Sequence, residues 1–348
     1  MKHAGEYIVA LVSLFTLGLF GVASYYPLEN LWGFNHLHFL PQWWFWVYCA
    51  LILLAVYLSF GFKSEQRVAR VVEAIDNLLF TGRVRPRLIL ALVCGLLFYL
   101  FRVQTHLLGD GYTWLAEFGR GEAYIHKLTE PGSIYMLRWM QSLFGGFTES
   151  TALAAFQISS ILSGMVIVFI SPEILRRLCD EALVRVLGLI SILFSGAMLL
   201  FFGYVEFYPV SWAASVLFIW AAVEYCLDRR RLWLVILLWL LAVAMHLQAL
   251  YFIPGIAWLL VWAIKNRRVR QVGYGVLIVG AVASVGMMVW LYRTRIDFEI
   301  LILPLFFGRP VAPDYAIVSW SHLLDLINEA FLVLPGFVVI GLLWAMNR

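Results

Sequence analysis

The feature that most constrains this chain is a series of apolar blocks near 20 residues long, separated by short charged stretches. A transmembrane helix needs about 20 predominantly apolar residues to cross a bilayer. An outer-membrane barrel would instead show alternating strands of about ten residues. Because the blocks are continuous, the pattern predicts an all-α, polytopic transmembrane helical bundle. Charged residues make up 13% of the chain, about half the share of a soluble domain, which excludes a water-soluble globular enzyme.

Ten membrane spans are predicted along the chain. They cover residues 6–26, 42–62, 88–103, 151–170, 186–202, 210–227, 232–247, 248–264, 272–292 and 331–346. Basic residues favour the cytoplasmic side of a membrane protein. With the N-terminus inside, most of the 25 Lys and Arg residues lie in inner segments, whereas acidic residues predominate outside. We therefore expect a multi-pass protein of the cytoplasmic (inner) membrane, with its active face outside.

Residues 232–264 test this topology, because they can be read as one span or two. A single helix of this length would be about 50 Å long, far more than a hydrocarbon core of about 30 Å. Two short spans keep the basic residues from Lys265 to Arg270 inside and place His246 and Gln248 at an outer turn. The two-span interpretation is preferred for that reason.

Three parts are expected along the chain. Residues 1–62 form an N-terminal transmembrane hairpin, residues 63–87 a basic cytoplasmic connector, and residues 88–348 a transmembrane core. The core has two long outer loops, at 104–150 and 293–330. The connector can form an amphipathic surface helix that ends near Thr81 and Gly82.

The outer loop 104–150 predicts two helical pieces, at about 112–118 and from Pro131 to Phe144. Proline is favoured in the first turn of a helix. Apolar residues of the second piece repeat at helical spacing, with polar residues between them, so this helix is expected to lie in the membrane interface. The apolar set is Ile134, Leu137, Met140, Leu143 and Phe144, and the polar set is Ser133, Arg138 and Gln141.

Two carboxylates are the strongest candidates for chemistry. Asp110 lies in Gly109-Asp110-Gly111-Tyr112, where the flanking glycines allow close approach to a ligand. The alternative is a plain Asp-Gly turn after a helix. Glu206 lies in a short outer connection, between Tyr204 and Pro209. An ionisable group so close to hydrocarbon usually faces protein or a water-filled cavity; the alternative is a cap for the helix that begins at Pro209.

Further candidates lie in other outer segments. His246 is either a functional residue or a structural histidine at its turn. In 293–330, Ser319 can cap a helix running to Leu332, with His322, Asp325 and Glu329 on one face. That face either lines a groove over the membrane or forms the wet side of an interfacial helix. No HExxH, Walker A, GxGxxG or GxSxG motif is present, and no basic stripe points to nucleic acid.

The arrangement of spans and outer loops resembles the GT-C superfamily of integral-membrane glycosyltransferases. The stretches LLGDGYTWL, TEPGSIYML, FFGYVEFYP, AMHLQALYFIPG and SWSHLLDLINEAFLVLPG are similar to those of bacterial multispan glycosyltransferase-like proteins, over about residues 88–348. Members typically carry an acidic residue and juxtamembrane helices in their first large outer loop, and Asp110 and the helix from Pro131 match these. Here that loop follows the third span, so residues 1–62 are an addition, and Asp110 has no neighbouring paired acid.

The resemblance implies transfer of a hexosyl or pentosyl group from a polyprenyl-phosphate-linked donor on the non-cytoplasmic face. Asp110 would be the base, and Glu206 would orient the acceptor or share a divalent cation, Mg²⁺ or Mn²⁺, with Asp110. The partners would be the lipid-linked donor, membrane lipids and a glycan, lipid or protein acceptor. The residues expected to bind substrate are Tyr112, Glu130, Arg138, Tyr204, His246, Arg293, Arg295, His322 and Asp325.

Two other classes of function remain open at this point. A transporter or flippase would place charged groups near the bilayer midplane and often show inverted repeats, neither of which is evident in the sequence. A non-enzymatic membrane scaffold would tolerate changes to single carboxylates and depend instead on aromatic loop residues such as Trp114 and Trp139.

Overall fold

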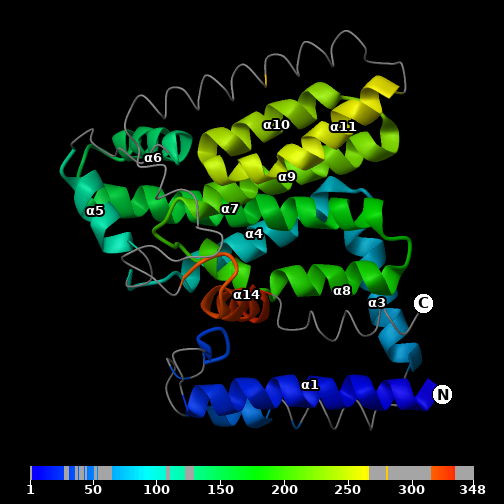
Figure 1. Ribbon diagram of the computed structural model, residues 1–348. Coiled ribbons are helices and arrows are strands. Elements are labelled where there is room, and N and C mark those ends of the chain that lie inside the picture. The colour runs from blue at the N-terminus through cyan, green and yellow to red at the C-terminus, as the bar shows by residue number, and fades with distance from the viewer. Residues whose placement is uncertain are drawn as a thin grey trace. The chain divides into compact units, whose positions relative to one another are not determined.

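The computed structural model describes residues 2–26, 31–35, 38, 43, 45–50, 53, 65–106, 110–121, 129–265, 280 and 315–333. Over these residues every regular element is a helix, which confirms the all-α prediction (Figure 1). The chain divides into two compact units, and each is described by itself. The first comprises Met1–Val71, Phe194–Ala197 and Asp297–Arg348, and the second comprises Val72–Leu193 and Met198–Ile296.

The first unit contains helix α1 (Lys2–Tyr25) and helix α14 (Trp320–Val333). The Phe34 ring packs between them, with its centroid 5.2 Å from that of Phe20 and 4.4 Å from that of Phe331. The buried Asn328 side chain accepts a hydrogen bond from the Gly33 N–H at 2.9 Å. Short contacts from residues 31–35 therefore connect two helices that are nearly 300 residues apart in sequence.

Two predicted helix features are present as expected. At α14, the Ser319 hydroxyl accepts a hydrogen bond from the His322 N–H at 3.2 Å, which is the capping interaction predicted for this serine. The amphipathic helix predicted in the connector is α3 (Glu65–Leu79). The turn after it contains Gly82 at a φ of +79°, a conformation that favours glycine.

Helix α7 (Glu149–Leu178) is the centre of the second unit. It packs against α4 (Val84–Leu100), α8 (Ala182–Leu193), α9 (Tyr208–Asp228) and two shorter helices, α5 and α6 (Figure 1). A capping box at Thr148 starts α7. Gly164 faces Phe98 and Phe201, and an added Cβ there would lie 2.5 Å from the Phe201 Cβ. A small residue at this position therefore permits close packing of the core.

Helices α9, α10 (Leu232–Met245) and α11 (Ile253–Lys265) pack around a shared apolar core. Between α10 and α11 the chain leaves the α-helix at His246 and continues as the 3₁₀-helix η4 (Leu247–Phe252). This break confirms that 232–264 is two helices. By contrast, the predicted span 186–202 is wrong as one helix: α8 ends at Leu193, and the 3₁₀-helix η3 (Gly196–Phe201) follows. Ser195 and Gly196 at the junction are weak helix formers.

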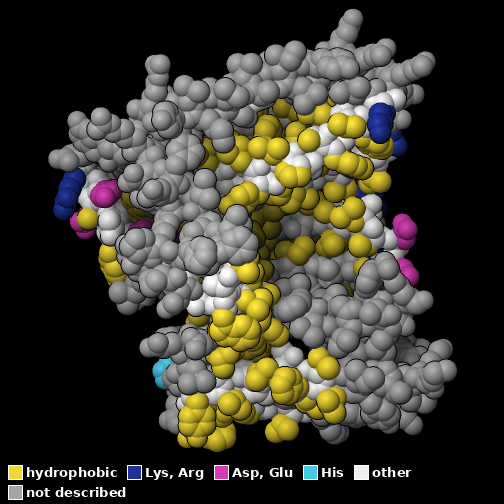
Figure 2. All heavy atoms as spheres, in the orientation of Figure 1, with side chains coloured by type: hydrophobic (Ala, Val, Ile, Leu, Met, Phe, Trp, Pro, Cys, Tyr) yellow, Lys and Arg dark blue, Asp and Glu magenta, His cyan; other side chains and the backbone are white. Residues whose placement is uncertain are grey.

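Helices α7 and α9 are long and apolar enough to cross a membrane. Helices at α1, α4, α10 and α11 coincide with four more predicted spans, although the last three are shorter. The spans predicted at 272–292 and 331–346, and most of 42–62, lie outside the described residues. Hydrophobic side chains cover much of the visible described surface, and the visible charged side chains of the second unit gather at the helix ends (Figure 2).

Candidate functional site

The site is built where α5 (Gly111–Gly119) and α6 (Pro131–Leu143) meet the beginning of α7. Both helices were predicted within loop 104–150 and are confirmed. Their packing is aromatic: the Phe118 ring lies 5.1 Å from that of Phe156, and the Trp114 ring lies 4.8 Å from that of Phe207. This apolar cluster forms the rigid base on which the polar residues around it are placed.

Two of the three polar residues predicted between the apolar positions of α6 are buried against protein. Ser133 and Gln141 are fully buried, whereas Tyr135 and Leu143 are exposed. The Gln141 Nε2 donates to the carbonyl oxygens of Phe118 and Thr148, each at 3.1 Å. Buried polar groups are acceptable where they are hydrogen-bonded, and these bonds tie α6 to its neighbours.

The beginning of α6 is joined to the turn after α10 by two hydrogen bonds. The Ser133 hydroxyl donates to the Met245 carbonyl at 2.8 Å, and the Leu247 N–H donates to the Thr129 carbonyl at 2.7 Å. Gly132 makes the close approach possible, since an added Cβ would lie 2.6 Å from the Ala244 carbonyl oxygen. These contacts bring Glu130 beside His246, more than 100 residues away in sequence.

Glu130 and His246 form a buried pair. The His246 Nε2 lies 3.1 Å from the Glu130 Oε1. The His246 Nδ1 accepts a hydrogen bond from the Gln248 N–H at 3.0 Å, which places the imidazole proton on Nε2, facing the carboxylate. The second oxygen of Glu130, Oε2, is buried and has no hydrogen-bond partner among the described residues. The Glu130 Oε2 can therefore still accept a hydrogen bond, as far as the described residues are concerned.

Asp110 and Glu206 meet in the same region. The buried Glu206 accepts a hydrogen bond from the Asp110 N–H through Oε1 at 3.0 Å, while the Asp110 side chain is exposed. The connection carrying Glu206 is anchored on α7, where the Ser160 hydroxyl accepts the N–H groups of Gly203 and Tyr204 at 3.1 and 3.2 Å. Gly203 has a φ of +72°, which the turn requires. Glu206 thus fixes the backbone of the turn from which Asp110 projects.

Tyr208, at the start of α9, connects the two pairs. Its ring stacks on His246 with centroids 5.4 Å apart, and its hydroxyl interacts electrostatically with Glu206, Glu130 and Asp110. Burial, together with the negative charge of Glu206, raises the pKa of the Tyr204 hydroxyl. Three carboxylates predicted separately from the sequence therefore lie in one cluster, which we call the acidic cluster: Asp110, Glu130 and Glu206.

His106 and Tyr208 were not predicted as site residues. His106 is buried, and burial lowers the pKa of its imidazole. Its Nδ1 has no hydrogen-bond partner in the described part of the chain, and its ring makes an edge contact with Tyr112 at 5.5 Å. The signal for both residues was their nearness in sequence to Asp110 and Glu206, whereas the contacts themselves depend on the tertiary fold.

The remaining predicted site residues are placed differently. The Arg138 guanidinium lies over the rings of Phe118 and Phe147, at 5.4 and 5.7 Å from their centroids. His322 and Asp325 belong to the first unit, where both Asp325 carboxylate oxygens accept hydrogen bonds, from the Trp32 indole and the Tyr315 hydroxyl. Arg293 and Arg295 lie outside the described residues.

A metal centre does not fit the residues that the structure describes. Among them no group of three or more His, Cys, Asp or Glu side chains is arranged to hold an ion. The Glu206 Oε1 accepts a backbone N–H, and the Glu130 Oε1 lies 3.1 Å from the His246 Nε2, so these two oxygens already face groups of the protein.

Comparison of the chain with protein-family models, with curated proteins and with solved structures finds no match. The functional conclusion therefore depends on the acidic cluster and its surroundings.

Proposed function

We propose that the chain is an integral-membrane glycosyltransferase of the GT-C type, which transfers a sugar from a polyprenyl-phosphate-linked donor to an acceptor on the non-cytoplasmic face. The observation that carries this proposal is the acidic cluster, where a buried Glu206 holds the backbone of an exposed Asp110 beside the Glu130–His246 pair. Buried carboxylates gathered at one end of an apolar helical bundle are costly and are typical of functional sites.

The topology belongs to the same proposal. Ten spans with the N-terminus inside place the acidic cluster on the outer side of the membrane, where lipid-linked sugars are used. The exposed Tyr135 and Trp139 of α6 suit a membrane interface, because aromatic residues are enriched at the level of the lipid headgroups. A donor held by its lipid tail would then present its sugar phosphate beside α5 and α6.

In the proposed reaction, the acceptor hydroxyl oxygen attacks the anomeric carbon of the donor while Asp110 takes the hydroxyl proton. The bond from the anomeric carbon to the phosphate oxygen breaks, and the polyprenyl phosphate leaves with the electron pair. Asp110 suits the role of base because its side chain is exposed while its backbone is held. Glu206 is a positioning residue for that turn, and the Glu130 Oε2, which has no hydrogen-bond partner among the described residues, can orient a substrate hydroxyl. No step requires a metal ion.

The test is donor consumption by the purified protein in proteoliposomes, using short-chain polyprenyl-phosphate hexoses and pentoses with added glycan and lipid acceptors, and measuring released polyprenyl phosphate. We expect Asp110→Asn to lower the rate by at least about 100-fold, the lower range for a general base, while unfolding stays unchanged. Glu117→Gln, which removes a carboxylate within α5, is the matched control and should retain full activity.

Full activity in Asp110→Asn would remove the assignment of the base. Vesicles that move the labelled lipid or a solute across the membrane without breaking the sugar–phosphate bond would contradict the transferase and support the transporter.

A further inference from the structure

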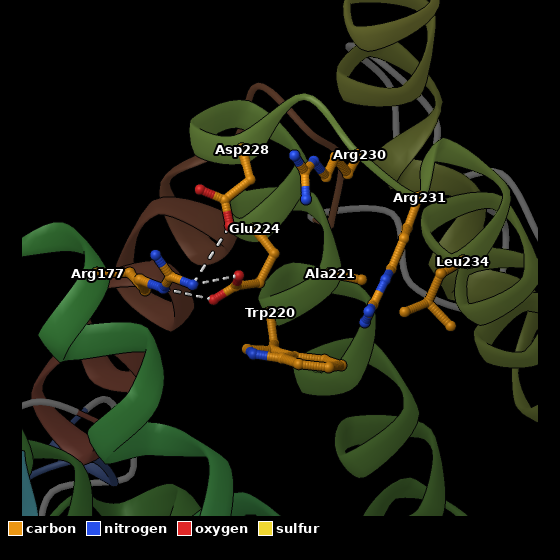
Figure 3. A pocket seen from close by; sticks show the side chains of 8 residues that line it. All are labelled: Arg177, Trp220, Ala221, Glu224, Asp228, Arg230, Arg231 and Leu234. Atoms are coloured by element: carbon orange, nitrogen blue, oxygen red, sulfur yellow. Dashed lines mark hydrogen bonds and ion pairs between the residues drawn. The ribbon is translucent and has the colours of Figure 1, made fainter. Parts of the chain in front are cut away.

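A second polar site lies at the opposite ends of α7 and α9. Helix α9 begins at Tyr208, beside the acidic cluster, and ends at Asp228, about 30 Å away along the helix axis. There the structure contains a pocket of about 250 Å³. Its lining comes from the end of α7, the last turns of α9 and the beginning of α10 (Figure 3): Arg177, Trp220, Ala221, Glu224, Asp228, Arg230, Arg231 and Leu234.

The charges of this pocket are not balanced. Arg177 is paired with both acids, at 2.7 Å from Glu224 and 3.4 Å from Asp228. Arg230 and Arg231 enter from the turn between α9 and α10, and neither has an ion-pair partner in the described part of the chain (Figure 3). Two guanidinium groups are therefore available at the pocket for an anion.

The turn that directs these arginines is held in an unusual conformation. Arg229 and Arg231 have φ values of 57° and 64°, in the left-handed region that residues with a Cβ rarely adopt. The Arg229 guanidinium lies 3.4 Å above the Trp262 ring centroid, which holds that side chain away from the pocket. The turn thus separates one packed arginine from the two that enter the pocket.

The wall of the pocket contains a hydrogen-bond donor that is unused among the described residues. The indole Nε1 of Trp220 is buried and has no hydrogen-bond partner there. A buried donor left without an acceptor costs free energy, about 1–3 kcal/mol in typical cases. Two guanidinium forks and an indole N–H together favour an acceptor with several oxygens and a negative charge, and guanidinium geometry matches phosphate.

We propose that this pocket binds a phosphate group, carried either by an anionic phospholipid or by a free phosphate. The volume is below the range of about 300–1,000 Å³ common for drug-sized ligands, so it fits a small headgroup. Large hydrophobic side chains near the pocket are exposed, including Leu227 and Trp233, and can contact acyl chains if the phosphate belongs to a lipid. This site is independent of the proposed transferase activity.

Binding is measured by isothermal titration of the delipidated full-length protein in detergent. The probes are short-chain phosphatidylglycerol, short-chain phosphatidylcholine and inorganic phosphate. We expect the wild type to bind an anionic probe, and the double variant Arg230→Gln/Arg231→Gln to bind it at least about tenfold more weakly, because hydrogen bonds between charged groups are lost. Arg83→Gln/Arg85→Gln removes two exposed arginines elsewhere and should leave binding unchanged.

Trp220→Phe keeps an aromatic ring, although a smaller one, and removes the indole N–H, so it tests the pocket without changing charge. It should weaken binding severalfold. Tighter binding of phosphatidylglycerol than of phosphate identifies a lipid headgroup, and equal binding identifies a soluble phosphate. Absence of binding to both anionic probes, or equal losses in the pocket and control double variants, would overturn the proposal.

Discussion

The two ends of α7 and α9 carry largely buried carboxylates that are held in opposite ways. In the acidic cluster, Glu206 binds a backbone N–H and Glu130 faces a histidine. At the other end Glu173 binds the guanidinium groups of Arg87 and Arg176, and Arg177 bridges it to α9. The second arrangement neutralises its charges and joins three helices. The first leaves the Glu130 Oε2 without a hydrogen-bond partner among the described residues, and such groups are typical of functional sites.

This contrast separates two roles for buried charged side chains, one structural and one functional. A buried charge in an apolar bundle is expensive unless it is paired, so a fully paired network serves the structure. In the acidic cluster the buried Glu130 Oε2 has no hydrogen-bond partner among the described residues, and the cost of leaving it so is consistent with function. We call the end with the Glu173 network the paired end, and the end with the acidic cluster the acidic end. The comparison predicts that changes at the paired end reduce stability and that changes at the acidic end reduce activity.

The largest effect is expected from Glu173→Gln at the paired end. The Glu173 side chain is 13% exposed and the Arg87 side chain 8%, so the change leaves a buried guanidinium without its carboxylate. Loss of one partner of a buried ion pair typically costs about 3–5 kcal/mol. Denaturant unfolding in detergent measures the change in the free energy of unfolding.

Glu181→Gln is the matched control for this prediction, because Glu181 is an exposed acid just beyond the end of α7. It should change the free energy of unfolding by less than about 0.5 kcal/mol. If Glu173→Gln were as stable as this control, the paired network would not hold α4, α7 and α9 together.

A second, smaller loss of stability is expected from Gly132→Ala at the acidic end. The added Cβ meets the Ala244 carbonyl oxygen and pushes α6 from the turn after α10. Extra atoms in a well-packed region typically lower the free energy of unfolding by about 1–3 kcal/mol. Because the same contact places Glu130 beside His246, donor consumption should fall together with the melting temperature. Gly18→Ala in α1 is the control, since an added Cβ there meets nothing within 4 Å. A stable Gly132→Ala variant with full activity would contradict the docking of α6.

The sequence predicted much of this arrangement and missed its contacts for identifiable reasons. Apolar block length predicted α7 and α9, and Pro131 predicted the start of α6, because these signals are local. The burial of Gln141 was missed because helical periodicity reports which residues are polar, and gives no information about carbonyl groups on other helices that can satisfy them. In the same way, Asp110 and Glu206 were each identified, but the hydrogen bond between positions 96 residues apart depends on tertiary packing.

Glu206→Gln gives the smallest of the three free-energy changes and the sharpest test of the acidic end. The amide oxygen of glutamine can still accept the Asp110 N–H, so the turn should keep its position and the free energy of unfolding should change by less than about 0.5 kcal/mol. The negative charge is lost, and we expect donor consumption to fall about tenfold, or about 1.4 kcal/mol in activation free energy. Glu206→Ala removes the acceptor as well and should reduce the rate further. If the glutamine variant is fully active and the alanine variant is not, Glu206 acts only through the hydrogen bond. If the glutamine variant instead unfolds as readily as Glu173→Gln, the Glu206 charge stabilises the fold, and the distinction between the two ends of α7 and α9 fails.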